Sequence, residues 1–239
     1  MNEVLTVKHE KKWISGYAVI LCLTLLVTCW GSHTVTVFSE NAPIQRKNTI
    51  VIDPGHGGID GGATSCTGAL ESGFNLEISL RLNDLLHFLG YQTKMIRTED
   101  ISVYQKGDTI ARKKISDLKE RVRMIGQTEN PMLLSIHQNY FPDGKYSGAQ
   151  VFYAQTEGSQ FLAERLQQDF VKYLNPGSKR QAKKSSGIYL MEHVTCPAVL
   201  IECGFLSNPE EEAMLRSREY QQKLCCVIGS VVSRTLSNT

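Results

Sequence analysis

Four residues capable of metal binding or acid–base chemistry stand at the ends of predicted elements: His56, Glu71, His137 and Glu202. Two imidazoles and one carboxylate are a ligand set that catalytic zinc uses, with a fourth position left open to water. Hydrolysis then requires a second carboxylate that is close to the metal but outside its ligand set. In such a site Glu202 would accept a proton from the attacking water and return it to the leaving amine. The pattern favours a hydrolase with one Zn²⁺ per chain.

Each of these residues also has an ordinary structural explanation, so spacing alone leaves coincidence open. An acid in the first turn of a helix, as predicted for Glu71, commonly complements the helix dipole. A core histidine is the usual explanation for His137, but the strand ends there and the turn Pro142-Asp143-Gly144 follows. Glu202 closes an apolar strand, where acids are rare unless they are paired or coordinated. The chain has no H-E-x-x-H helix, so the ligands would come from separate loops.

Strands and helices alternate along the chain in a way that brings these residues together. The alternation predicts a single α/β domain with a mostly parallel, twisted sheet and helices on both faces. Ligands bind beyond the carboxyl ends of the strands in such sheets, and the glycines around His56 permit a tight turn there. The predicted strands are 49–53, 92–97, 132–139, 148–154, 188–191 and 198–202, and the predicted helices span about 72–89, 116–128, 159–174 and 217–236.

The N-terminal region has the composition of an export segment. Lys8, Lys11 and Lys12 precede the uncharged run 13–31, which is close to the ~20 residues that span a bilayer. We expect residues 1–39 to be an export signal or an N-terminal membrane anchor, 40–48 a linker, and 49–239 the catalytic domain. The domain is then expected to act outside the cytoplasmic membrane, and whether the segment is cleaved stays open.

Composition narrows the class of protein further. With 239 residues and 41% hydrophobic content the chain can bury one sizeable core. A net charge of +2 gives no reason to expect nucleic acid as a partner. The seven cysteines form no C-x-x-C pair, so we expect core cysteines and neither a zinc ribbon nor a redox motif.

The chain carries four motifs in order, which are Asp53–Gly58, Glu71 with Asn75-Leu76-Glu77, Ser135–Asn139 and Pro197–Asn208. Together they resemble those of the zinc-dependent N-acetylmuramoyl-L-alanine amidases, in register from about Thr49 to the C-terminus. In that family the positions matching His56, Glu71 and His137 bind zinc, and the position matching Glu202 is catalytic. The resemblance implies an α/β zinc-amidase fold and hydrolysis of the amide between the lactyl group of muramic acid and L-alanine in peptidoglycan.

An export segment followed by a catalytic domain without wall-binding repeats most resembles the germination-specific, spore-cortex amidases of endospore formers. That likeness implies a role in cortex maturation, where muramic lactam is formed, and in germination, on the cortex side of the forespore membrane. The chain departs from family habit at Ser72-Gly73, where a lysine is frequent, and at Cys203. Neither departure involves the four candidate residues.

A basic loop from Asn175 to Gly187 supplies candidates for substrate binding. Arg180 and Lys183 match an R-x-x-K feature of related amidases, and with Asn139 they are expected to contact the substrate. The two basic residues are expected to face carboxylates of the muropeptide. A solvated basic face is the alternative explanation of this loop.

Other functions remain compatible with the sequence. The same metal site would serve a zinc carboxypeptidase or aminopeptidase acting on wall peptides. A non-catalytic wall-binding or activator module would have no need for both the metal ligands and Glu202. Cys203 as a nucleophile lacks a histidine nearby in sequence. Peptidoglycan is the expected substrate, and an activator protein and N-terminal membrane association stay open.

Overall fold

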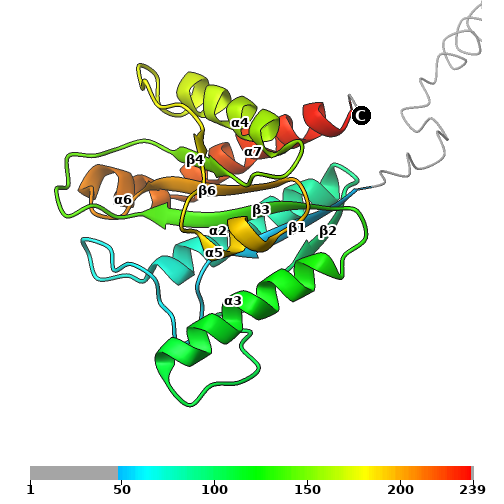
Figure 1. Ribbon diagram of the computed structural model, residues 1–239. Coiled ribbons are helices and arrows are strands. Elements are labelled where there is room, and N and C mark those ends of the chain that lie inside the picture. The colour runs from blue at the N-terminus through cyan, green and yellow to red at the C-terminus, as the bar shows by residue number, and fades with distance from the viewer. Residues whose placement is uncertain (1–47, 238–239) are drawn as a thin grey trace, which may run out of the picture. The chain divides into compact units, whose positions relative to one another are not determined.

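The computed structural model describes residues 48–237. Within that range the chain forms an α/β fold around a six-stranded sheet of order β2-β1-β3-β6-β4-β5 (Figure 1). The strands are β1 (Thr49–Pro54), β2 (Gln92–Met95), β3 (Pro131–Asn139), β4 (Gln150–Tyr153), β5 (Lys183–Lys184) and β6 (Ala198–Phe205). The helices are α2 (Glu71–Phe88), α3 (Ile110–Gly126), α4 (Ser159–Tyr173), α5 (Tyr189–His193), α6 (Pro209–Arg216) and α7 (Arg218–Leu236).

The predicted export segment, residues 1–39, and nearly all of the predicted linker lie outside the described residues. Between residues 48 and 237, none of the helices combines the length and the apolar character needed to cross a membrane.

The sheet is mostly parallel, as predicted. Strands β2, β1, β3 and β6 run in one direction, whereas β4 pairs with β6 in the antiparallel sense. The carboxyl ends of β1, β3 and β6 therefore lie along one edge of the sheet, together with the beginning of β4. The candidate residues of β3 and β6 are at this edge.

Alternating side chains of the central strands build a core on each face of the sheet, because successive strand residues point to opposite sides. Ile50 and Ile52 pack in a cluster with residues of α2, α4 and α7, while Val51 packs in a second cluster with residues of α3 and α5. Figure 1 shows α3 on one side of the sheet and α4 and α7 on the other. The prediction of helices on both faces is confirmed.

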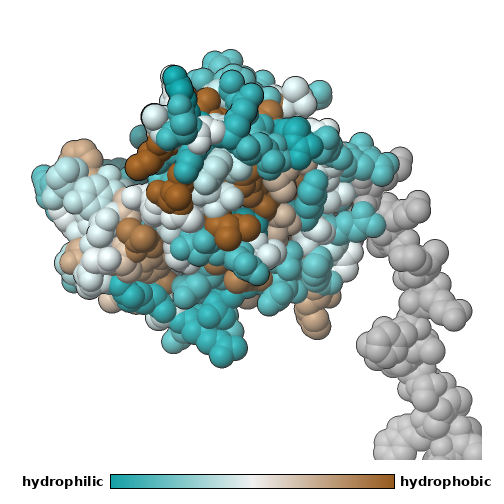
Figure 2. Space-filling view, turned by 90° about the horizontal axis from the view of Figure 1, so that it is seen from below, coloured by the Kyte–Doolittle hydropathy of each residue, from teal (hydrophilic) through white to brown (hydrophobic). Residues whose placement is uncertain are grey.

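The outer surface carries hydrophobic residues as separate patches. Figure 2 shows the face seen from below, on which such patches interrupt a mainly hydrophilic and intermediate surface. Phe161 of α4 is 51% exposed, and Arg165 lies over its ring.

Two predicted elements differ from the structure. The segment 188–191 is not a strand: α5 forms there, with Glu192 N donating to Ile188 O and the Glu192 side chain accepting from Gly187 N. Leu190 and Met191 are both buried, a pattern that a helical turn and a strand covered on both faces share. Helix α3 begins at Ile110 and not near 116, because Thr109 caps it by accepting from Arg112 N.

Candidate metal centre and active site

His56 lies in a strained turn just beyond the end of β1. Its φ of 59° is in the left-handed region, which is uncommon for a residue other than glycine. Its Nδ1 donates to Asp60 Oδ2 at 3.0 Å, and Lys114 Nζ pairs with Asp60 Oδ1 at 2.7 Å. This arrangement orients the imidazole so that its other nitrogen, Nε2, lies 3.3 Å from Glu71 Oε2.

Glu71 is the first residue of α2 and is buried. Its Oε1 lies 3.0 Å from His137 Nδ1 and accepts from Gln138 N at 3.1 Å and from Asn75 Nδ2 at 3.2 Å. Burial acts to raise the pKa of Glu71, but hydrogen bonds from His137 and His56 outweigh it and hold this pKa far below its usual range. Glu71 is therefore a carboxylate between two imidazoles.

The imidazole of His137 lies where any residue other than glycine at position 55 would place its Cβ atom. A Cβ on Gly55 would lie 2.2 Å from His137 Cε1, and one on Gly62 would lie 2.5 Å from Glu71 Oε2. The rings of His56 and His137 meet edge to face with centroids 5.0 Å apart. The glycine-rich turn and the following loop thus form a cradle around the three side chains.

The three side chains fit a single metal ion. His56, Glu71 and His137 each offer one ligand atom, and these atoms lie within 4.8 Å of one another. Two nitrogens and one carboxylate oxygen match the donor set that zinc favours in catalytic sites. Although burial lowers the pKa of His56, Glu71 and Asp60 raise it to about 9, so the histidine carries a proton that a metal would displace.

Glu202 lies in β6, directly opposite His137 of β3 in the parallel ladder. Its Oε2 is buried, and the part of the chain that the structure describes gives it no hydrogen-bond partner. Burial raises the pKa of Glu202 to about 7. A carboxyl group with such a pKa is suited to exchange protons near neutral pH.

Two buried arginines hold the backbone of the His56 turn, and sequence reasoning missed both. Arg121 donates to Asp53 Oδ1 at 2.5 Å, to Pro54 O at 2.9 Å and to His56 O at 2.6 Å. Arg97 donates to Pro54 O and Gly55 O, both at 3.0 Å. A helix-face arginine and an arginine after a strand carry no sequence signal for contacts to backbone carbonyls.

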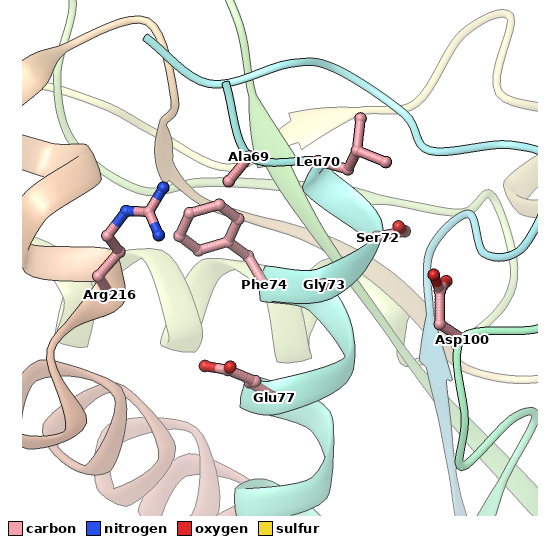
Figure 3. Close-up of a pocket in the computed structure, with 8 residues that line it drawn as sticks. All are labelled: Ala69, Leu70, Ser72, Gly73, Phe74, Glu77, Asp100 and Arg216. Carbon is pink, nitrogen blue, oxygen red and sulfur yellow. The ribbon is translucent and has the colours of Figure 1, made fainter. Parts of the chain in front are cut away.

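Two cavities lie near this edge of the sheet. One of ≈ 340 Å³ borders His56 and His137 and is lined further by Lys114 and by Tyr189 of α5. The other, of ≈ 350 Å³, lies beside the first turns of α2 and contains none of the four candidate residues. Figure 3 shows its lining, with the Phe74 ring and the Arg216 guanidinium close together. Arg216 Cζ lies 5.3 Å from the centroid of the Phe74 ring.

The predicted substrate-binding residues are spread along the sheet. Asn139 ends β3, and its carbonyl accepts from Leu206 N at 2.8 Å. Arg180 Nη1 lies 3.4 Å from Gln150 Oε1, and Gln150 pairs with Glu202 in the ladder, so Arg180 is at the same edge as Glu202. Lys183 is exposed in the outer strand β5, and the structure does not bring it to the metal cluster.

The cysteines are unpaired in residues 48–237 and only partly follow prediction. Cys196, Cys203 and Cys225 are buried, but Cys66 and Cys226 are exposed. Burial raises the pKa of the Cys203 thiol well above its ordinary value, so the reactive thiolate is disfavoured. Cys203 is unsuited to act as a nucleophile.

Comparison with known proteins shows that this chain matches a known family. Residues 50–232 match the family described as N-acetylmuramoyl-L-alanine amidase. The chain is 35% identical over 228 residues to the germination-specific N-acetylmuramoyl-L-alanine amidase of Bacillus subtilis (strain 168), covering 95% of each.

Solved structures of this family have the same fold. The CwlD amidase from Clostridioides difficile, solved in complex with the GerS lipoprotein, is similar with a TM-score of 0.76 and 35% identity, over 80% of this chain and 99% of that chain. An N-acetylmuramoyl-L-alanine amidase from Clostridium difficile 630 is similar with a TM-score of 0.69 and 30% identity, over 81% and 99%.

Proposed function

Because the chain belongs to the N-acetylmuramoyl-L-alanine amidase family, we propose that it cleaves the muramoyl–L-alanine amide of peptidoglycan with one zinc ion bound by His56, Glu71 and His137. The family confirms that the chain is an amidase of this class. The observation that carries the zinc proposal is the convergence of three ligand atoms within 4.8 Å at the end of a sheet, opposite an acid with an unpartnered oxygen.

The chain's own residues perform the acid–base and positioning steps. Zinc, when bound, supplies Lewis-acid polarisation and activates water for attack on a carbonyl. Glu202 accepts a proton from the attacking water, whose oxygen forms the new bond to the lactyl carbonyl carbon. As the carbon–nitrogen bond breaks, Glu202 returns that proton to the nitrogen of L-alanine. Asp60 keeps His56 in the required orientation through the 3.0 Å hydrogen bond.

Product analysis tests the reaction. Purified peptidoglycan digested by the enzyme should yield intact stem peptides with new free amino termini on L-alanine. A zinc carboxypeptidase or aminopeptidase would instead release amino acids from the ends of the stem and leave the muramoyl amide intact. Release of single amino acids without free stem peptides would contradict the proposal.

A role in the spore cortex and a position outside the cytoplasmic membrane belong to the same proposal. They are supported by the similarity to the germination-specific amidase over 95% of both chains and by the basic and apolar pattern at residues 8–31. The similarity to CwlD, solved with the GerS lipoprotein, supports a lipoprotein as a binding partner. Cortex from spores lacking this chain should contain no muramic lactam; normal lactam content would exclude the cortex role.

A further inference from the structure

A cluster of exposed aromatic side chains follows β3 immediately. Tyr140, Phe141 and Tyr146 lie in the connection between β3 and β4 and are 49%, 47% and 40% exposed. We refer to these three residues as the aromatic platform. Large aromatic side chains gathered in one surface loop commonly mark a binding site.

Two rings of the platform, those of Phe141 and Tyr146, are held against the domain. The rings of Phe141 and Tyr146 pack edge to face with centroids 4.7 Å apart, and Tyr146 stacks on the buried Phe205 at 6.2 Å. Phe141 N donates to Ser207 Oγ at 3.1 Å, and Asn208 Nδ2 donates to Tyr146 O at 3.2 Å. A ligand would meet these two rings already ordered, so little of their side-chain entropy is lost on binding.

The platform adjoins the catalytic edge of the sheet. Its first residue comes three positions after His137. At its other end, Arg180 Nη2 donates to Ser147 O at 3.0 Å and reaches Gln150, the ladder partner of Glu202. The platform is therefore continuous with the candidate site through the ends of both β3 and β4.

The two sides of the candidate site differ in character. The ≈ 340 Å³ cavity beside His56 includes Lys114 and belongs to the face covered by α3 and α5. The platform instead packs against the start of α6, whose Leu215 belongs to the core of the other face. The two charged side chains of its loop, Asp143 and Lys145, pair with each other at 2.5 Å. The platform thus offers aromatic rings beside one paired lysine, whose Nζ lies 5.5 Å from the centroid of the Tyr146 ring. The cavity is instead lined by charged groups of both signs, among them Lys114 and Asp60.

We propose that the aromatic platform binds the glycan strand of peptidoglycan, next to the muramoyl residue whose amide is cleaved. This inference rests on the proposed function, because it takes the substrate to be a glycan chain that carries peptides. Sugar rings present flat C–H faces that pack on aromatic rings. Stem peptides instead carry amide and carboxylate groups, which suit a cavity lined by charged and polar side chains. The glycan lies on the platform side of the site, and the peptide lies on the cavity side.

The test compares substrates that differ only in glycan length. Full-length Tyr140→Ala, Phe141→Ala and Tyr146→Ala enzymes are assayed on a monosaccharide muramoyl peptide and on uncrosslinked glycan chains bearing the same peptide. For each variant we expect kcat/KM on the long chains to fall about tenfold more than on the monosaccharide, mainly through KM. Tyr146→Phe, which keeps the ring, should restore the wild-type ratio. Phe88→Ala and Tyr173→Ala, at exposed aromatics elsewhere on α2 and α4, are the matched controls.

Binding separates this inference from the proposed function. Glycan strands freed of all peptides should bind the wild-type enzyme and bind the platform variants about tenfold more weakly. Equal losses on long and short substrates, unchanged ratios, or undiminished glycan binding would overturn the platform proposal while leaving the amidase intact. A wild-type enzyme that frees no stem peptide from either substrate would instead refute the proposed function.

Discussion

Glu202 and His137 are direct partners in the parallel ladder between β3 and β6, so their side chains leave the sheet on the same face. This register places an acid beside the candidate metal ligands without any contribution from a loop. A slip of one residue would move the acid to the opposite face. The hydrophobic residues that precede both positions fix the register, because Ile136 and Ile201 are fully buried.

The cradle around His137 depends on Gly55. In Gly55→Ala the new methyl group would meet the imidazole at 2.2 Å, so His137 must move away from Glu71. We expect zinc content to fall well below one per chain and activity to be lost, as measured by metal analysis of the purified protein. Gly73→Ala is the control, since nothing lies within 4 Å of its Cβ position; it should keep zinc and gain up to about 1 kcal/mol of stability. Full zinc in Gly55→Ala would refute the cradle.

Arg121 stabilises both the fold and the His56 turn. Arg121→Ala leaves Asp53 buried without its cation and frees the carbonyl of His56. Breaking a buried ion pair in this way typically costs about 3–5 kcal/mol, which urea unfolding would measure. Zinc affinity should fall as well. Arg112→Ala removes a surface ion pair with Asp108 and should change neither quantity. Unchanged zinc affinity in Arg121→Ala would show that the turn needs no such support.

Zinc binding should release protons and strengthen as pH rises. In the metal-free protein Glu71 and Asp60 raise the pKa of His56 to about 9, and only the neutral imidazole binds metal. The raised pKa also means that protonation of His56 stabilises the metal-free fold below about 6.5 and that this contribution is lost as pH rises through about 9. Zinc titrations at pH 6, 7 and 8 should show tightening affinity; pH-independent affinity would argue against His56 as a ligand.

The N-terminal region should be dispensable for folding but needed for location. Residues 46–239 form a compact unit by themselves. Deleting residues 1–39 should leave the melting temperature of the domain and its zinc content unchanged in the purified protein. In cells the truncated enzyme should fail to modify the wall, which muropeptide analysis would detect. Normal wall modification by the truncated chain would rule out an export role for the segment.

Much of the site follows from sequence because parallel strands end at a common edge. His56, His137 and Glu202 each end or follow an apolar run, and their convergence needs only the rule for open α/β sheets. Only the family motifs predicted Glu71 as a metal ligand, because an acid at the start of a helix is already explained by its favourable interaction with the helix dipole. The fold class was predictable from the alternation of strands and helices along the chain.

The remaining features depend on tertiary contacts that no local pattern encodes. Arg97 and Arg121 act on carbonyl groups of a turn far away in sequence, and any residue type supplies a carbonyl. Helix α5 has only five residues, so a helical period does not show in its sequence and a short apolar segment there also fits a strand. The antiparallel direction of β4 arises from the loop that carries the aromatic platform, which returns the chain along β6.

The most direct test of the central claim is zinc content and turnover measured together in Glu202→Gln. The amide keeps the shape of the side chain but cannot accept a proton. We predict one zinc per chain, as in the wild type, near-normal substrate binding, and a kcat about 10²–10⁴-fold lower. His137→Ala, measured in parallel, should lose its stoichiometric zinc. A Glu202→Gln enzyme that lost its metal would make Glu202 a ligand, and one with near-normal turnover would remove it from the mechanism.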